Sequence, residues 1–201
     1  MSPTLTKVDV KELNRAAAQE PSIVDVPAMR FLMLDGTGNP NEPGDFQDAI
    51  QALYSLSYGA KFTLKKQGIE FKVSPLEGLW GSPGGLNPNQ KADWKWIAMI
   101  RQPAEVTPSV LEKVRAEALR KKPLRALSRV RLEEFSEGLA AQVMHLGPYS
   151  AEAPTITRLH EFIEKQGYRP VGKHHEIYLG DPRRSAPERL KTLIRQPIER
   201  G

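Results

Sequence analysis

The peptide Met99-Ile100-Arg101-Gln102-Pro103 returns near the end of the chain as Leu193-Ile194-Arg195-Gln196-Pro197. The two copies lie 94 residues apart (195 − 101). A match this short can arise by chance. Its weight therefore depends on whether the elements that precede it recur as well.

The segments before the two copies follow the same order. In each half, a strand-like run ends at a glycine, an amphipathic helix follows, and a further strand precedes the repeated peptide. The first set comprises Ile23–Asp35 running into Gly36, a helix over Phe46–Ser57, short strands at Lys61–Lys66 and Ile69–Ser74, and the strand Asp93–Gln102; the second comprises Glu137–Leu146 running into Gly147, a helix over Ala151–Gln166, and strands at His174–Leu179 and Arg189–Glu199. The sequence therefore predicts two similar strand–helix–strand–strand modules.

The predicted modules span about 23–106 and 128–199, after a polar N-terminal extension over 1–22. A helix over 108–120 joins them, because Thr107 suits a helix N-cap and Pro108 suits the first helical position. Each module alone has a thin sheet, and pairing the two buries both sheets. We expect an α+β fold of tandem modules, with a groove between them as the natural ligand site.

Composition narrows the class of protein. The chain has 201 residues, and 29 Lys and Arg against 24 Asp and Glu give a net charge of +5. The basic run Arg120–Arg125 is typical of a solvated face, so we expect no nucleic-acid partner. The absence of cysteine excludes disulfides and thiol chemistry.

No long apolar run is present and the N-terminus carries charges where a signal peptide needs apolar residues, so we expect a soluble cytoplasmic protein with no membrane partner. Its oligomeric state stays open, and a monomer is compatible with the sequence.

The stretch His174-His175-Glu176-Ile177-Tyr178-Leu179 is the most promising site for chemistry. It has strand composition and ends at a Gly-Asp-Pro turn signal. Alternation places His174, Glu176 and Tyr178 on one face, and His175 with its apolar neighbours on the other. Glu176 is then either a solvated surface carboxylate or a groove residue that acts as a general acid or base, or as counter-ion to a cationic ligand.

Aromatic side chains form a second set of candidates. Trp94 and Trp96 are two residues apart on a predicted strand and share a face, and Trp80 closes the preceding segment. The repeat brings further tyrosines near the groove: Tyr54, Tyr58, Tyr149 and Tyr178. Core filling is the alternative for each of them.

Motifs for other chemistries are absent. The histidines His160, His174 and His175 with Glu176 could imitate a metal set, but His174 and His175 point to opposite faces and no HExxH spacing exists. The cluster around Gly36 lacks the elements of a P-loop or a dinucleotide fingerprint, and no GxSxG elbow occurs. We therefore expect neither a metal nor a cofactor.

Several stretches together resemble the stand-alone GyrI-like small-molecule-binding proteins, from about Ile23 to Glu199. They are VDVPAMRFLMLDGTGNPN, FQDAIQALYSLSYGAKF, FKVSPLEGLW, DWKWIAMIRQP and, most specifically, HHEIYLGDPRRSAPERLKTLIRQPIE. The resemblance implies two pseudo-two-fold-related modules with antiparallel sheets and a central groove. In related drug-sensing domains a groove glutamate with aromatic neighbours binds cationic aromatic compounds, and the matching position here is Glu176.

Some stand-alone relatives are hydrolases that open the strained cyclopropane of alkylating antibiotics. The resemblance implies that Glu176 activates a water, that Tyr149 or Tyr178 assists, and that a flat ligand is held by Trp80, Trp94 and Trp96. Tyr54, Tyr58 and His174 are further ligand-binding candidates, because the repeat and strand alternation place them at the groove. Gly81 stands where relatives often carry a second aromatic residue, which affects one wall of the pocket. Two alternatives remain: a sensor or sequestering module without turnover, and a protein-interaction module that inhibits DNA gyrase.

Overall fold

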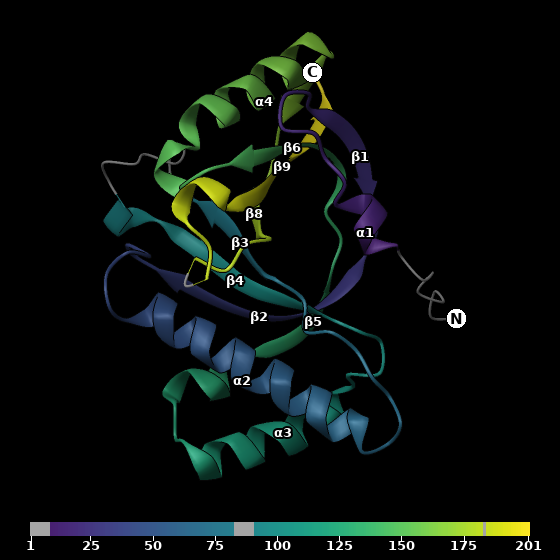
Figure 1. Cartoon of the computed structure of the whole chain (residues 1–201), viewed down its shortest axis with the longest axis vertical. Coiled ribbons are helices and arrows are strands. Elements are labelled where there is room, and N and C mark those ends of the chain that lie inside the picture. Colours follow the sequence, from purple (N-terminus) through teal and green to yellow (C-terminus); the bar gives the residue numbers. More distant parts are fainter. Residues whose placement is uncertain (1–8, 83–90, 183) are drawn as a thin grey trace. The chain divides into compact units, whose positions relative to one another are not determined.

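The computed structural model describes residues 9–82, 91–182 and 184–201. It divides the chain into two compact units, which Figure 1 lets the reader follow by colour along the sequence. The terminal unit combines Met1–Ala28 with Ser136–Gly201, and the central unit is Met29–Phe135. The terminal unit is therefore assembled from both ends of the sequence.

The central unit is built on an antiparallel sheet in the order β3-β4-β2-β5. Helices α2 and α3 pack against each other beside this sheet (Figure 1). In chain order its elements are β2 (Met29–Thr37), α2 (Asp45–Lys65), β3 (Leu76–Gly81), a 3-10 turn (Lys91–Asp93), β4 (Lys95–Gln102), α3 (Pro108–Lys121), a second 3-10 turn (Arg125–Arg129) and β5 (Arg131–Phe135).

Apolar alternation explains how this unit packs. Phe31 and Met33 of β2 form one core cluster with Leu79 of β3 and Met99 of β4. On α2 the buried residues recur at spacings of three and four, so one stripe of the helix faces inward. They are Ala49, Ala52, Leu53, Leu56, Ser57, Ala60 and Leu64.

The start of α3 follows its predicted capping. The Thr107 hydroxyl accepts a hydrogen bond from the Val110 amide at 3.3 Å, and Pro108 occupies the first helical turn. Helix α3 covers the range 108–120 of the predicted joining helix, and it lies wholly within the central unit.

The terminal unit has an antiparallel sheet in the order β1-β6-β9-β8, and β7 pairs with the end of β9. Helix α4 packs against this sheet, and its Leu159 and Ile163 join a core cluster with Ala141, Val143 and Ile194. In chain order the elements are α1 (Val10–Leu13), β1 (Ser22–Val26), β6 (Gly138–Leu146), a 3-10 turn (Tyr149–Ala151), α4 (Ala153–Lys165), β7 (Tyr168–Pro170), β8 (His174–Tyr178), a 3-10 turn (Pro187–Arg189) and β9 (Lys191–Arg200).

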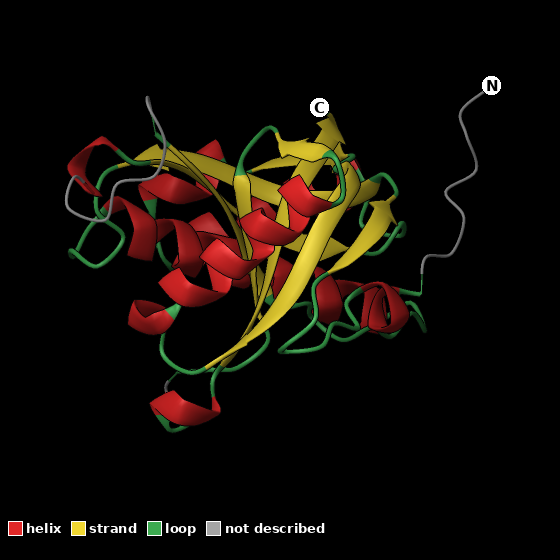
Figure 2. Cartoon of the chain, turned by 90° about the horizontal axis from the view of Figure 1, so that it is seen from above, coloured by secondary structure: helices red, strands yellow, loops and turns green. Residues whose placement is uncertain are grey.

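The predicted α+β class is confirmed. The described residues form four α-helices and nine strands, and Figure 2 shows this mixture by colour. All pairs of neighbouring strands within each unit are antiparallel. Within the described part of the chain, no helix combines the length and apolar character that crossing a membrane requires.

The single strand predicted over Ile23–Asp35 is instead two strands. β1 ends at Val26 and β2 begins at Met29, with Pro27 between them. Proline donates no backbone hydrogen bond, so it interrupts the ladder. The two strands belong to different units, because β1 pairs with β6 while β2 pairs with β4 and β5. The units therefore differ in their boundaries from the predicted modules 23–106 and 128–199.

The predicted strands at Lys61–Lys66 and Ile69–Ser74 are wrong. Helix α2 continues to Lys65, because Ala60 and Leu64 extend its buried stripe, and residues 69–75 contain no strand. The first copy of the repeated peptide pairs with β2 on one side and with β3 on the other.

Because β3 takes the place of the predicted strand Ile69–Ser74, the residue of the first half that is equivalent to Glu176 also changes. Glu176 pairs with Ile194, and the equivalent residue of the first copy, Ile100, pairs with Leu76. The counterpart is therefore the apolar Leu76. The predicted strand Ile69–Ser74 would have offered Lys72 at this position. At this position the repeat places a carboxyl group in the terminal unit alone.

Candidate functional site

A polar cluster surrounds Glu176 in the terminal unit. Its carboxylate accepts a hydrogen bond from the Tyr178 hydroxyl at 2.8 Å, and its other oxygen lies 3.1 Å from His174 Nε2. The three side chains lie on one face of β8, as strand alternation predicts. The Glu176 side chain is 15% exposed and that of His174 only 7%. The carboxylate is thus held in place by two neighbours and still reaches solvent.

Tyr149 joins this cluster from the turn before α4. Its ring meets that of Tyr178 edge to face, with centroids 5.4 Å apart and an interplanar angle of 74°. Tyr149 is 39% exposed, so it lies at the edge of the cluster. The structure therefore brings together all four candidates that the sequence placed in the second half of the chain: Tyr149, His174, Glu176 and Tyr178.

Glu152 is a second carboxyl group in the cluster, and the sequence analysis missed it. It occupies the N-cap position of α4, where its backbone carbonyl accepts hydrogen bonds from the Thr155 and Ile156 amides. Its side chain makes no capping hydrogen bond, and the residue is only 6% exposed. A glutamate at a helix start is usually explained by the helix dipole, so its sequence position gave no signal of this burial.

Burial and the neighbouring carboxylate of Glu176 raise the pKa of Glu152 to about 8, and the nearby Thr192 hydroxyl opposes this rise. Thr192 pairs with Tyr178 across β8 and β9, which places it beside the cluster. At neutral pH the Glu152 carboxyl is therefore mostly protonated.

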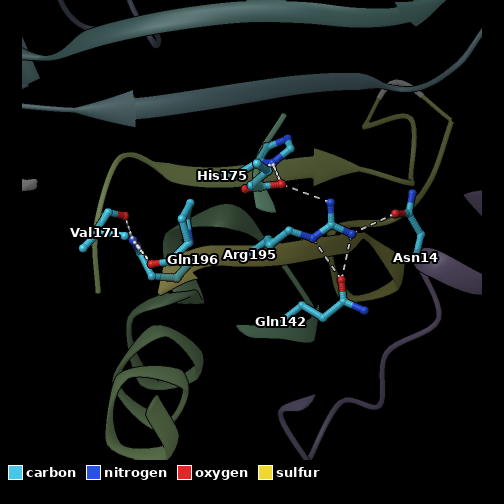
Figure 3. A network of polar contacts seen from close by, with 8 residues as sticks. Asn14, Gln142, Val171, His175, Arg195 and Gln196 are labelled. Carbon is cyan, nitrogen blue, oxygen red and sulfur yellow. Dashed lines mark hydrogen bonds and ion pairs between the residues drawn. The ribbon is translucent and has the colours of Figure 1, made fainter. Parts of the chain in front are cut away.

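The opposite face of β8 carries a buried ionic network around Arg195 (Figure 3). His175 Nδ1 lies 3.0 Å from both carboxylate oxygens of Glu137, and Arg195 Nη1 donates to the same carboxylate at 3.3 Å. The guanidinium also donates twice to Gln142 Oε1, at 3.0 and 2.8 Å, and once to Asn14 Oδ1 at 3.0 Å. Arg195 thus links Asn14, the residue after α1, to the sheet. His175 contributes to this network rather than to the Glu176 cluster.

The three tryptophans gather in the central unit with Phe46. Trp80 and Trp96 pair across β3 and β4. Phe46 contacts both, with ring centroids 5.3 Å from Trp80 and 4.9 Å from Trp96, and Trp94 meets Trp80 at 5.6 Å. Trp80 and Trp96 are buried, whereas Trp94 precedes β4 and is partly exposed. Two of the three indoles therefore fill the core of their unit.

Tyr54 and Tyr58 lie one turn apart on α2. Their ring centroids are 6.2 Å apart, and Phe62 continues the row at 6.3 Å from Tyr58. Tyr58 is 46% exposed and Phe62 59%. These rings form an exposed aromatic row, and their predicted contact with a ligand stays a prediction.

The described residues contain no group of three or more His, Asp or Glu side chains placed to hold a metal ion. His174 and Glu176 lie within hydrogen-bond distance of each other, and the nearby Glu152 carboxyl is mostly protonated because its pKa is raised to about 8.

Gly36→Ala is expected to lower the free energy of unfolding by about 1–3 kcal/mol, the usual cost of overpacking. A Cβ at this position would lie 2.1 Å from Cη2 and Cζ2 of Trp96, which is 1% exposed and cannot move aside freely. Denaturant unfolding measures the cost. Trp96→Phe removes both ring atoms, so Gly36→Ala should cost less in that background; an equal cost in both backgrounds would contradict the packing.

The chain is similar to a known protein family and to solved structures of other proteins. Residues 19–199 match the model of the GyrI-like small molecule binding domain. An uncharacterized conserved protein from Listeria innocua is 39% identical, with a TM-score of 0.88, 94% of this chain covered and 97% of that chain. A hydrolase encoded by lin2189 from the same organism is also 39% identical over the same shares, with a TM-score of 0.85.

More distant similarity concerns the fold alone. The C-terminal domain of EcmrR is 12% identical with a TM-score of 0.56, covering 90% of this chain and 98% of that domain. The comparison with curated proteins found no match.

Proposed function

The chain belongs to the GyrI-like small-molecule-binding family, and we propose that it binds planar aromatic or cationic small molecules and hydrolyses strained, cyclopropane-bearing alkylators. The observation that carries this proposal is the Glu176 carboxylate, held by Tyr178 and His174 and still open to solvent. A fixed carboxylate of this kind suits both tasks, because it attracts a cation and accepts a proton from water.

The hydrolytic step follows from the groups around Glu176. A water beside the carboxylate attacks the cyclopropane methylene carbon of the ligand, and a carbon–carbon bond of the strained ring breaks. Its electron pair passes into the conjugated carbonyl, whose oxygen becomes an oxyanion. Glu176 takes the proton from the water, and the oxyanion then gains a proton to give the neutral product. Overall, one water is added and no oxidant or reductant is consumed.

The tyrosines have separate tasks in this scheme. The Tyr178 hydroxyl donates to Glu176 and fixes the carboxylate for proton transfer. Tyr149 packs edge to face on Tyr178 and is more exposed, so its hydroxyl is the group we assign to the ligand carbonyl. His174 holds the second carboxylate oxygen.

Hydrolysis is supported by the relatives named as hydrolases, at 38% and 39% identity over nearly the whole chain. The second candidate is sequestering without turnover, which the family's description as a small-molecule-binding domain favours. In both cases Glu176 contacts the ligand, and only the addition of water differs.

Product analysis in water enriched with ¹⁸O separates the two candidates. The purified protein is mixed with a cyclopropane alkylator, and the small molecules and the protein are examined by mass spectrometry. Hydrolysis predicts a ring-opened product with one labelled oxygen on the former methylene carbon. Recovery of unchanged alkylator from a saturable complex would favour sequestering. Ring opening at the rate of buffer alone, with no complex, would contradict both candidates.

A further inference from the structure

Glu152 is buried without the partners that a buried charge requires. Its Oε1 atom has no hydrogen-bond partner, and in the described part of the chain its carboxyl group forms no ion pair. The Glu152 side chain lies at the start of α4, but no helix amide donates a hydrogen bond to it. Leaving a lone carboxylate in such a place is costly, so the neutral acid is the stable form.

The groups that face Glu152 explain where its proton belongs. These are Glu176 of β8 and the Thr192 hydroxyl of β9. His174 and Tyr178 in turn contact Glu176. Glu176 already receives one hydrogen bond from Tyr178 and lies against His174, so its negative charge is stabilised while that of Glu152 is not. Two adjacent carboxyl groups in such unequal surroundings favour ionisation of one and protonation of the other.

Two further histidines lie near the cluster. His145 is occupied by the Thr155 hydroxyl at 3.0 Å and the Pro148 carbonyl at 3.2 Å. Burial and the neighbouring His174 lower the pKa of His160, so this ring stays neutral near pH 7. His160 therefore supplies no positive charge to Glu152.

We propose that Glu152 and Glu176 share one proton in the ligand-free protein, and that a cationic ligand bound beside Glu176 drives this proton into solvent. The second half rests on the proposed ligand site at Glu176. The ligand class is a planar aromatic cation, and the exchange is one cation for one proton. Glu152 acts through Glu176, as a positioning residue that holds the proton until the ligand arrives.

Electrostatics supplies the coupling. Burial and the negative charge of Glu176 both keep the proton on Glu152, and an added positive charge beside Glu176 opposes them. The raised pKa of Glu152, about 8, means that the proton is present near pH 7 and available for release. By linkage, the affinity for the cation rises with pH below about 8 and levels off above it, at most about tenfold per pH unit. A neutral ligand of the same shape should show much weaker dependence.

Titration of the ligand-free protein tests the shared proton directly. Glutamate is labelled with ¹³C at Cδ, and the carboxyl signals are followed by NMR from pH 4 to 10. We expect one glutamate signal to titrate near pH 8 and to vanish in Glu152→Gln. In Glu176→Gln the Glu152 signal should titrate at lower pH, whereas Glu164→Gln, an exposed change on the same helix, should leave it unaltered. If every glutamate of the wild type titrated below pH 6, the shared proton would be disproved, whatever the variants do.

Calorimetry with ethidium, a planar aromatic cation with fixed charge, tests the exchange. Binding heats at pH 7 in two buffers with different ionisation enthalpies give the number of protons released. We expect about one proton per ethidium for the wild type and close to none for Glu152→Gln. Equal release by both proteins would overturn the exchange. If ethidium bound Glu176→Gln as tightly as the wild type, the proposed ligand site would fail instead, while the NMR titration would still decide the shared proton.

Discussion

Arg195→Met is expected to lower the free energy of unfolding by about 3–5 kcal/mol, the usual cost of removing one partner from a buried ion pair. Arg195 and Glu137 have side chains that are both 1% exposed. Without the guanidinium, Glu137 keeps His175 as its partner among the described residues, and Gln142 and Asn14 lose the donor that Arg195 supplies. Denaturant unfolding of the two proteins at pH 7 measures the loss.

The sequence provides a matched control in the first copy of the repeated peptide. Arg101 occupies the position equivalent to Arg195, but it is only partly buried, and Glu77 is its electrostatic neighbour. Arg101→Met should therefore cost clearly less than Arg195→Met. Equal losses would show that the network in Figure 3 does not stabilise the terminal unit in the way described.

Acid unfolding gives the same network a second test. Burial alone would raise the pKa of Glu137, but His175 and Arg195 together lower it below its ordinary value. A carboxyl group with a lowered folded-state pKa stabilises the fold above its ordinary pKa, and this contribution disappears as the pH falls through the lowered value. Since Arg195 is one of the charges that lower it, Arg195→Met should unfold at a higher pH than the wild type during acidification.

Glu176→Gln is expected to reduce kcat/KM for cyclopropane opening by at least about 100-fold, within the range that general bases contribute. Glutamine keeps the size of the side chain and can still accept from Tyr178, but it takes no proton from water. The rate of ring opening, followed by absorbance of the conjugated carbonyl, measures the effect. The variant should unfold at a similar denaturant concentration, so that the loss is chemical.

Two comparisons make this result specific. Glu164→Gln removes an exposed carboxylate from α4 and should retain the parent rate. Tyr178→Phe keeps the ring contact with Tyr149 but removes the hydroxyl that fixes Glu176, and it should retain more activity than Glu176→Gln. If Glu176→Gln turned over as fast as the wild type, the carboxylate would not be the base.

Local pattern was enough to predict the geometry of β8. Strand alternation separated His174, Glu176 and Tyr178 from His175, and the contacts on the two faces of β8 follow this division. The same reasoning placed Trp94 and Trp96 on one face of a strand, but Trp94 precedes β4 and is partly exposed, whereas Trp96 is buried. These predictions required only the alternation of side chains between the two faces of a strand.

Features that depend on distant contacts were not predictable in this way. Nothing near Val26 shows that β1 pairs with β6, more than a hundred residues later. Residues 61–66 have a composition that fits a strand, yet packing of Ala60 and Leu64 keeps them helical. The burial of Glu152 arises only when α4 is placed against β8 and β9, so its raised pKa has no signature in the sequence.

The central claim is that a small molecule binds beside the Glu176 carboxylate. The most direct measurement is a crystal structure of the protein with an unreactive, planar analogue of the cyclopropane ligand. We expect the analogue to touch Glu176 or a water held by it, with a contact of about 3 Å, and to lie near Tyr178 and Tyr149. An analogue bound elsewhere, with the contacts of Glu176 to Tyr178 and His174 unchanged and no ligand beside them, would contradict the claim.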